Sequence, residues 1–575
     1  MCDLTGHRYP PDGLGGPPMA SHDVAVAPVP RLRAVQALAR RARALHGWLE
    51  RPPLILYVGA LVYVAVLTYL SWVRFEDLSA GTFDLGVKVQ GVSTALGGGP
   101  VDTPDWMLTD GALGPSLFGI HFSPLAYAIA PLAAVLPPAL VLFVLEWSAL
   151  AVAALLVHKV ARDSRLGPGS SLAISALFLV FPPFLMSGLY DFHYVSLFPA
   201  LGLLLYLLLR EGRDRMALGV LFLGACAQEG FLILAAFLAV QLWVDHPPAW
   251  RDLPWPFRWK GRARMALVVA VLASIGFVGE LAFLRSVSPA RSTILFTSIG
   301  PGFGPGAWSD FLGLKLAYWA TVLALTGFLP VLGARRAVAL APPLVLFWFA
   351  DNPGFSMFQW QYAFLLAPGL FLALVEGTAV LGRALRALGA RFGPSRSGSE
   401  RGMTPRRDEG TTRLRRRMAS AVPGSVPLAL IALLLLSVVY SPALPYSSAL
   451  TDPRQVTNYA LPANSSALDA LFASVPTTSS VLASDYLFAH VARGPHDYPI
   501  LVYGGLLGHL PPGFVPTYVL IFVQDAPWAH RLDPSFPSLY GRVRDVNATT
   551  MVCVPGHACA SVNYDVVLFR ADGPS

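Results

Sequence analysis

Apolar runs of nearly membrane-spanning length recur along this chain. Two of them, residues 171–189 and 195–209, are separated only by a short polar break at 190–194 (YDFHY). About 20 consecutive apolar residues are needed to cross a bilayer as a helix. Of the 575 residues, 54% are hydrophobic and 13% are charged, whereas a soluble domain carries about 25% charged residues. The sequence therefore predicts an α-helical polytopic membrane protein and excludes a soluble globular fold.

The basic residues indicate how such a chain is oriented. They lie mainly between the apolar runs, as the positive-inside rule expects, so the net charge of +8 does not indicate a nucleic-acid partner. A basic segment at 31–51 precedes the first run, and segment 383–424 holds eleven arginines against three acids. We expect both segments in the cytoplasm, and the C-terminus outside the cell.

Three regions are predicted in chain order. They are a disordered, basic cytoplasmic segment (1–52), a transmembrane domain (53–443) and an extracytoplasmic α/β domain (444–575). We expect about eleven transmembrane helices, with a long first outer loop at 74–121 and a cytoplasmic loop at 383–424. In the last region, apolar and polar residues alternate in short runs, which is typical of strands.

One apolar stretch, 216–243, is interrupted by polar residues near its middle. The charge pattern favours two short helices that meet at Glu229-Gly230, because glycine permits a break and irregular backbone is tolerated where it lines a cavity. The alternative is one long tilted helix that buries Glu229 near the middle of the membrane. Either arrangement makes Glu229 a candidate functional residue, since an acid is costly in hydrocarbon.

With this topology, acids, histidines and amides gather on the outer side of the membrane. The residues are Asp84, Asp110, His121, Asp191, His193, Gln228, Glu229, Gln359, Gln361 and Tyr362. Such a set can supply a general base with an orienting partner, bind magnesium or manganese, or relay protons. Each residue alone is also compatible with a cap, a turn or an interfacial hydrogen bond.

Short motifs in a fixed order carry a resemblance to a known family. They are F-D-L-G at 83–86, H-F-S-P at 121–124, D-F-H at 191–193, Q-E-G at 228–230 and Q-W-Q-Y at 359–362. By these motifs the chain resembles the family called domain of unknown function 2079 (DUF2079). That family is similar to the membrane glycosyltransferases of the C superfamily (GT-C), which use polyprenyl-phosphate sugars as donors.

The resemblance implies a glycosyltransferase that moves a sugar from a polyprenyl-phosphate-linked donor to an acceptor on the extracytoplasmic face. Its expected partners are membrane lipid and the lipid-linked sugar, and its expected cofactor is a divalent cation such as Mg or Mn. The site residues fall into three sets. Catalytic roles are expected for Asp84, Asp191 and Glu229; substrate binding for His121, His193, Gln228, Gln361 and Tyr362; and metal binding for Asp84, Asp191 and His193.

Two other classes of function fit the same composition. A transporter or flippase for a lipid-linked or small polar substrate predicts internal repeats and charged residues at mid-membrane. A non-catalytic membrane protein that presents its outer domain to partners leaves the acids and histidines without a role. The sequence contains no phosphate-binding P-loop, zinc-ligand pattern or nucleophile elbow, so those enzyme classes are not indicated.

Overall fold

The computed structural model describes residues 40–571 with gaps. The gaps are 42, 79–84, 98–117, 119–120, 248–260, 288–308, 351–352, 357, 359–360, 393–425, 440–463, 495, 501, 504–505, 508–509, 511–513 and 553–559. Asp84, Asp110 and Gln359 therefore lie outside the described residues, as does most of the arginine-rich segment. The chain divides into two compact units, Met1–Trp48 and Leu49–Ser575. Every site discussed below belongs to the second unit.

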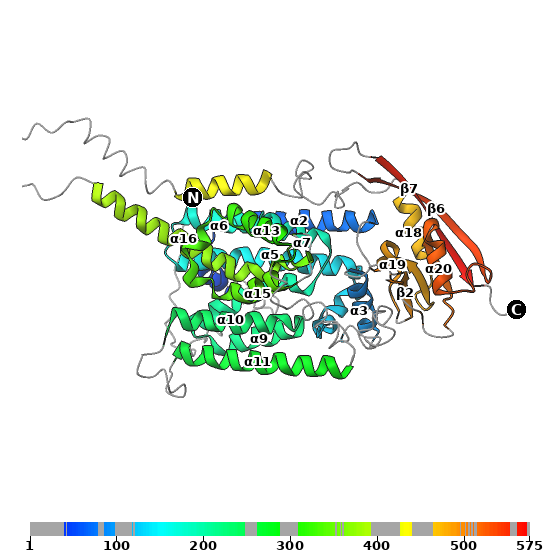
Figure 1. Ribbon diagram of the computed structural model, residues 1–575, viewed down its shortest axis with the longest axis horizontal. Helices are drawn as coiled ribbons and strands as arrows, with labels where there is room; N and C mark the ends of the chain where they lie inside the picture. The colour runs from blue at the N-terminus through cyan, green and yellow to red at the C-terminus, as the bar shows by residue number, and fades with distance from the viewer. Residues whose placement is uncertain are drawn as a thin grey trace, which may run out of the picture. The chain divides into compact units, whose positions relative to one another are not determined.

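Six helical segments among the described residues are long and apolar enough to cross a membrane. They are α2 (Leu54–Glu76), α5 (Pro138–Asp163), α6–α7 (Pro168–Leu179 and Pro182–Tyr190), η5–α8 (Tyr194–Leu197 and Phe198–Glu211), α11 (Gly261–Val287) and α16 (Ala363–Phe392). Shorter apolar helices accompany them (Figure 1). The helical membrane architecture is confirmed, whereas the predicted number of about eleven spans is not.

Several predicted runs are broken or extended in the structure. Run 171–189 is two helices, because Pro182 begins α7 and the residue before a proline avoids helical backbone. The apolar stretch 312–332 is likewise two helices, α13 (Leu312–Leu325) and α14 (Leu329–Leu332). In the predicted cytoplasmic loop, α16 continues to Phe392, ten residues beyond the span expected to end at 382.

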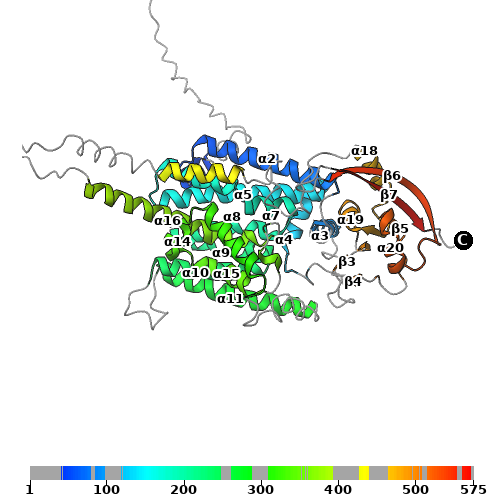
Figure 2. The same cartoon turned by 45° about the horizontal axis from the view of Figure 1, so that its top comes forward.

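The predicted break at Glu229-Gly230 is present. Helix α9 (Asp214–Ala227) ends at Gln228, whose φ of −171° and ψ of 145° are extended, and α10 (Gly230–Asp245) begins at once. This geometry excludes the single long helix. Helices α9, α10 and α11 pack together, as both views show (Figures 1 and 2). Glu229 is consequently held at the N-terminus of α10, between α9 and the rest of the bundle.

The C-terminal region forms a mixed five-stranded sheet in the order β2-β1-β5-β7-β6. Its strands are β1 (Val481–Ser484), β2 (Asp497–Ile500), β5 (Tyr518–Phe522), β6 (Tyr540–Val552) and β7 (Ala560–Ala571). β1 runs parallel to β2 and β5, whereas β7 is antiparallel to β5 and β6. Helices α18 (Ser465–Ala473), α19 (Asp485–Val491) and α20 (Ala526–Leu532) complete an α/β fold of the predicted kind.

The segment predicted to form the first outer loop contains a helix that sequence patterns did not predict, α3 (Val87–Leu96). The Nε2 amide of Gln90 in α3 donates hydrogen bonds to the carbonyl oxygens of Gly494 (2.7 Å) and Asp497 (3.0 Å). His490 stacks on Phe75 at the end of α2, with ring centroids 3.9 Å apart. These contacts fasten the C-terminal domain to the segment that leaves the first span.

Candidate functional site

The break between α9 and α10 brings an acid to a histidine from a distant loop. The Nδ1 atom of His121 lies 2.8 Å from Oε1 of Glu229, and the backbone N–H of Phe122 donates to Oε2 at 3.0 Å. The His121 side chain is 30% exposed and that of Glu229 only 7%. The carboxylate thus holds two consecutive residues of the H-F-S-P motif, while the imidazole stays accessible.

Gln228 completes this arrangement. Its Nε2 atom lies 3.1 Å from the same Nδ1 atom of His121. Nδ1 carries either a hydrogen, which it donates to Glu229, or a lone pair, which accepts from the Gln228 amide. The shorter contact to the carboxylate favours the hydrogen, and in that state the Gln228 amide lies beside the ring without a hydrogen bond to Nδ1. Nε2 of His121 then keeps a lone pair that can accept a proton. Of the predicted residues, the structure therefore brings His121, Gln228 and Glu229 together.

The polar break at 190–194 forms a second group, deeper in the bundle than expected for an outer loop. Asp191 and His193 are almost completely buried, and His193 Nδ1 lies 3.0 Å from the carbonyl oxygen of Asp191. The Asp191 carboxyl acts electrostatically on Glu146 of α5, which also faces the Ser196 side chain and the His193 backbone. Neither oxygen of Glu146 makes a hydrogen bond among the described residues.

The two groups lie on adjoining elements. The short helix η5, which follows the polar break, contacts α5, α8, α9 and α16. The ring of Phe198 at the start of α8 meets the ring of Phe231 at the start of α10 edge-on, with centroids 5.3 Å apart. These contacts place the residues after His193 against the residues after Glu229, so both polar groups belong to the same end of the helix bundle.

The remaining predicted residues occupy other surroundings. The Oε1 atom of Gln361 is buried and has no hydrogen-bond partner among the described residues. The ring of Tyr362 packs on Phe355 at a centroid distance of 4.1 Å. Asp84, the acid that the resemblance puts first, lies outside the described residues.

Among the described residues, the predicted divalent-cation site is incomplete. Among the described residues, no group of three or more His, Cys, Asp or Glu side chains has the arrangement of a metal site. Asp191 and His193 supply two of the three expected ligands, and the third would be Asp84. The part of the chain that the structure describes therefore does not by itself fit a bound divalent cation.

Sequence reasoning missed two buried acids. Glu146 is fully buried within α5, and Glu280 is 8% exposed within α11. Each is an isolated carboxyl inside an apolar run, which is by itself a signal of function because an ionisable group in hydrocarbon is costly. Glu280 also acts electrostatically on Glu229.

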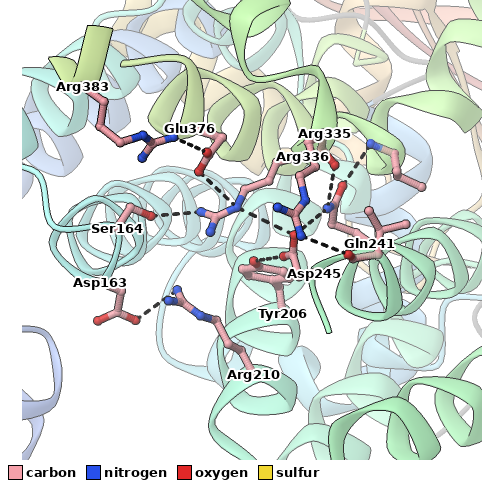
Figure 3. Close-up of polar contacts among 12 residues, drawn as sticks. Asp163, Ser164, Tyr206, Arg210, Gln241, Asp245, Arg335, Arg336, Glu376 and Arg383 are labelled. Atoms are coloured by element: carbon pink, nitrogen blue, oxygen red, sulfur yellow. Dashed lines mark hydrogen bonds and ion pairs between the residues drawn. The ribbon is translucent and has the colours of Figure 1, made fainter. Parts of the chain in front are cut away.

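A separate polar network joins the opposite ends of α5, α8 and α10 (Figure 3). The Arg336 guanidinium donates to Ser164 Oγ (2.9 Å) and lies 3.6 Å from Glu376 Oε2. Tyr206 donates to Asp245 Oδ2 at 2.6 Å. These residues join helix ends that lie opposite to the ends with Glu229 and the polar break. We therefore interpret the network as a structural support that holds the helices of the site together.

Apolar helices of membrane-spanning length and buried carboxyls define an integral, polytopic membrane protein. The family described as "Predicted membrane protein (DUF2079)" matches residues 74–536, which is well over half of the chain. The chain belongs to this family.

Known proteins add little beyond the family. No curated protein matches the chain. A solved structure that is similar to it is the apo form of an oligosaccharyltransferase from Archaeoglobus fulgidus, with 13% identity and a TM-score of 0.37, covering 88% of this chain and 74% of that one.

Proposed function

We propose that this protein is a membrane glycosyltransferase of GT-C-like architecture that uses a polyprenyl-phosphate-linked sugar and an acceptor on the extracytoplasmic face. The observation that carries the proposal is the His121–Glu229 pair, a partly exposed imidazole held by a buried carboxylate. A histidine oriented in this way is suited to general-base catalysis, because the unperturbed pKa of an imidazole, about 6.5, is close to neutral pH. A membrane location gives such a base direct access to a lipid-linked substrate.

In the proposed reaction, His121 Nε2 takes the proton of an acceptor hydroxyl group. The freed oxygen attacks the anomeric carbon of the sugar, a carbon–oxygen bond forms, and the bond from that carbon to the phosphate oxygen breaks. Polyprenyl phosphate leaves with the electron pair. Glu229 accepts a hydrogen bond from the Nδ1–H of His121 throughout, without taking the proton, and stabilises the imidazolium that forms.

The leaving phosphate requires nearby positive charge. Arg74 at the end of α2 lies next to the polar break, with Nη2 3.4 Å from the carbonyl oxygen of Tyr190. We assign Arg74 to the phosphate, and Lys88 of α3 is a second candidate. Asp191, His193, Gln228, Gln361 and Tyr362 are proposed to bind donor and acceptor.

Asp84 is proposed as a further catalytic carboxyl and, with Asp191 and His193, as a ligand for magnesium or manganese. No step above depends on that ion. The metal assignment is tested by treating the purified protein with a chelator and then adding each metal. Activity that is lost on chelation and restored by Mg or Mn in the native protein, but not in Asp84→Asn, supports the assignment. Activity unaffected by chelation contradicts it.

The central experiment uses full-length protein purified in lipid nanodiscs, polyprenyl phosphate carrying a labelled sugar, and membranes of the producing cells as the acceptor source. The native protein is expected to move label out of the donor. His121→Asn and Glu229→Gln should each lower the rate by about 10²- to 10⁴-fold, the usual contribution of a general base. Asp545→Asn, which changes an exposed carboxyl of β6, is the control and should leave the rate unchanged. Transfer that proceeds normally in His121→Asn rules out the proposed base.

A proton-coupled transporter is the second candidate, because Glu146 and Glu280 are carboxyls buried inside membrane-length helices. Intramembrane acids of this kind carry protons in pumps and transporters. Proteoliposomes with an imposed pH gradient provide the test. Proton-driven movement of a lipid-linked sugar that Glu146→Gln abolishes, without any transfer to an acceptor, would favour this function.

A further inference from the structure

Helix α3 contacts both the C-terminal domain and the segment that follows His121. In the domain it contacts α19, and in the other segment it contacts α4 (Leu125–Ile129) and the short helix η4 (Ala130–Ala134). Eight of the ten residues of α3 are buried. A helix of this length is marginal on its own, since about 12–15 residues are needed in water. The fold of α3 therefore depends on the neighbours that bury it.

Gln90 attaches α3 to the C-terminal domain. Its side chain is fully buried, and its Nε2 amide donates to the carbonyl oxygens of Gly494 (2.7 Å) and Asp497 (3.0 Å), between the end of α19 and the start of β2. A buried acceptor that loses its donor favours separation of the surfaces that enclose it. Loss of this one amide should thus loosen the contact between α3 and the domain.

Gly86, the last residue of the F-D-L-G motif, allows α19 to approach α3 closely. A Cβ atom on Gly86 would lie 2.8 Å from Phe488 Cδ1 and 3.6 Å from Ala489 Cα. The Phe488 ring is fully buried in the core of the domain, so it has no room to turn away. The backbone at Gly86 is ordinary helical (φ −58°), which any residue adopts. The close approach, and not the backbone conformation, therefore requires glycine here.

The H-F-S-P motif is built into the start of α4. The carbonyl oxygens of Ser123 and Pro124 each accept a hydrogen bond from the N–H three residues further along, both at 3.1 Å. The end of the motif is thus part of the first turn of α4. Because His121 lies only two residues before Ser123, a displacement of α4 would move His121 relative to Glu229.

We propose that the C-terminal domain positions His121 through α3, with Gln90 and Gly86 as the positioning residues. The domain buries α3, α3 supports α4, and α4 fixes the H-F-S-P motif where His121 bonds to Glu229 at 2.8 Å. Both residues act through α3 and not on the reacting atoms. The role rests on the base function proposed for His121, because its position matters to the reaction only if it takes the proton.

Hydrogen–deuterium exchange on the full-length protein in nanodiscs tests this coupling without a sugar donor. Gln90→Leu should speed exchange in peptides covering 121–134 by about tenfold or more, since buried acceptors lose their donor. Ser93→Ala is the matched control, because the Ser93 hydroxyl donates to the Val89 carbonyl oxygen within α3 itself (2.8 Å). Gly377→Ala, which disturbs the separate contact between α14 and α16, controls for a general loss of stability. Unchanged exchange at 121–134 in Gln90→Leu overturns the proposal, and so does an equal increase in Gly377→Ala.

The contact between Gly86 and Phe488 provides a second test, which holds even if Gln90→Leu does not fold. Gly86→Ala should also speed exchange at 121–134, because it pushes α3 away from α19. Adding Phe488→Leu makes room for the new methyl group and should return exchange toward the native rate, while Phe488→Leu alone shows the effect of the smaller side chain. Purely additive effects of the two substitutions would contradict the coupling, as would unchanged exchange in Gly86→Ala.

Sugar transfer is measured separately, so the two proposals can fail independently. If both hold, Gln90→Leu lowers the rate of transfer while exchange at 121–134 rises, and Ser93→Ala changes neither. Faster exchange in Gln90→Leu without any transfer by the native protein would refute the proposed function and support the coupling. Transfer by the native protein with unchanged exchange in Gln90→Leu would refute the coupling alone.

Discussion

At the scale of single residues, buried polar groups are held by specific partners from distant parts of the chain. Trp147 of α5 is fully buried, and its indole N–H donates to Ser71 Oγ of α2 at 2.9 Å. Ser71→Ala removes the acceptor and leaves a buried donor unpaired, which costs about 1–3 kcal/mol. We expect a lower melting temperature for this variant, measured by intrinsic fluorescence in detergent.

Ser274→Ala is the control for this prediction. The Ser274 hydroxyl donates to Ala270 within the same exposed part of α11, so its loss should change the melting temperature little. Equal melting temperatures for Ser71→Ala and the native protein would show that the Trp147 hydrogen bond contributes nothing to stability.

The sequence predicts isolated polar residues well and their pairing poorly. Glu229 and Asp191 were recognised because acids are conspicuous in apolar runs, although Glu146 and Glu280 carry the same signal. No local pattern shows that His121 bonds to Glu229, which is 108 residues away. That contact depends on how α9 and α10 pack against the segment before α4 (Leu125–Ile129), which is a property of the folded bundle.

At the scale of elements, close helix crossings depend on glycine. A Cβ atom on Gly377 of α16 would clash directly with the carbonyl oxygen of Leu329 in α14. Gly377→Ala must therefore push the two helices apart, and overpacking of this kind costs about 1–3 kcal/mol or more. We expect a clear fall in melting temperature and in the yield of folded protein by size-exclusion chromatography.

Gly382→Ala in the same helix is the matched control, because a Cβ there meets nothing closer than 3.7 Å. Alanine is the better helix former by about 1 kcal/mol, so Gly382→Ala should be neutral or stabilising. If both variants behave alike, the α14–α16 contact is not close in solution. Sequence patterns located α16 itself, but such crossings require knowledge of which helices are neighbours.

At the scale of the whole molecule, the sequence predicts a membrane bundle with a C-terminal α/β domain, and the structure contains both. Sequence patterns did not predict helix α3, because the segment is only mildly apolar. Most of its residues are buried by contacts with distant parts of the chain, which a local pattern does not show.

The predicted orientation of the chain in the membrane has its own test. In a cysteine-free background, a cysteine at Arg213 should react with an impermeant maleimide only in opened cells, and one at exposed Val543 of β6 should react in intact cells. The reverse pattern would invert the topology.

The attachment of the C-terminal domain should depend on pH through two groups with opposite signs. Burial between the Phe75 and Phe472 rings lowers the pKa of His490 from 6.5 to about 3. Burial also raises the pKa of the Asp497 carboxyl from 3.8 to about 7. The hydrogen bonds that this carboxyl accepts from the N–H groups of Arg493 and Gly494 lower the pKa, but burial has the larger effect. The contribution of His490 to the free energy of unfolding therefore decreases as pH falls below 6.5. The contribution of Asp497 decreases as pH rises from 3.8 toward 7.

Between about pH 4 and 6.5 the two contributions oppose each other, each by up to about 1.4 kcal/mol per pH unit, so the melting temperature of the native protein should change little. Asp497→Asn removes the contribution that falls with pH, and its melting temperature should rise steadily up to pH 6.5. His490→Gln leaves that contribution alone, and its melting temperature should fall over the same range. Parallel pH profiles for the two variants would show that these side chains do not control the stability of the domain.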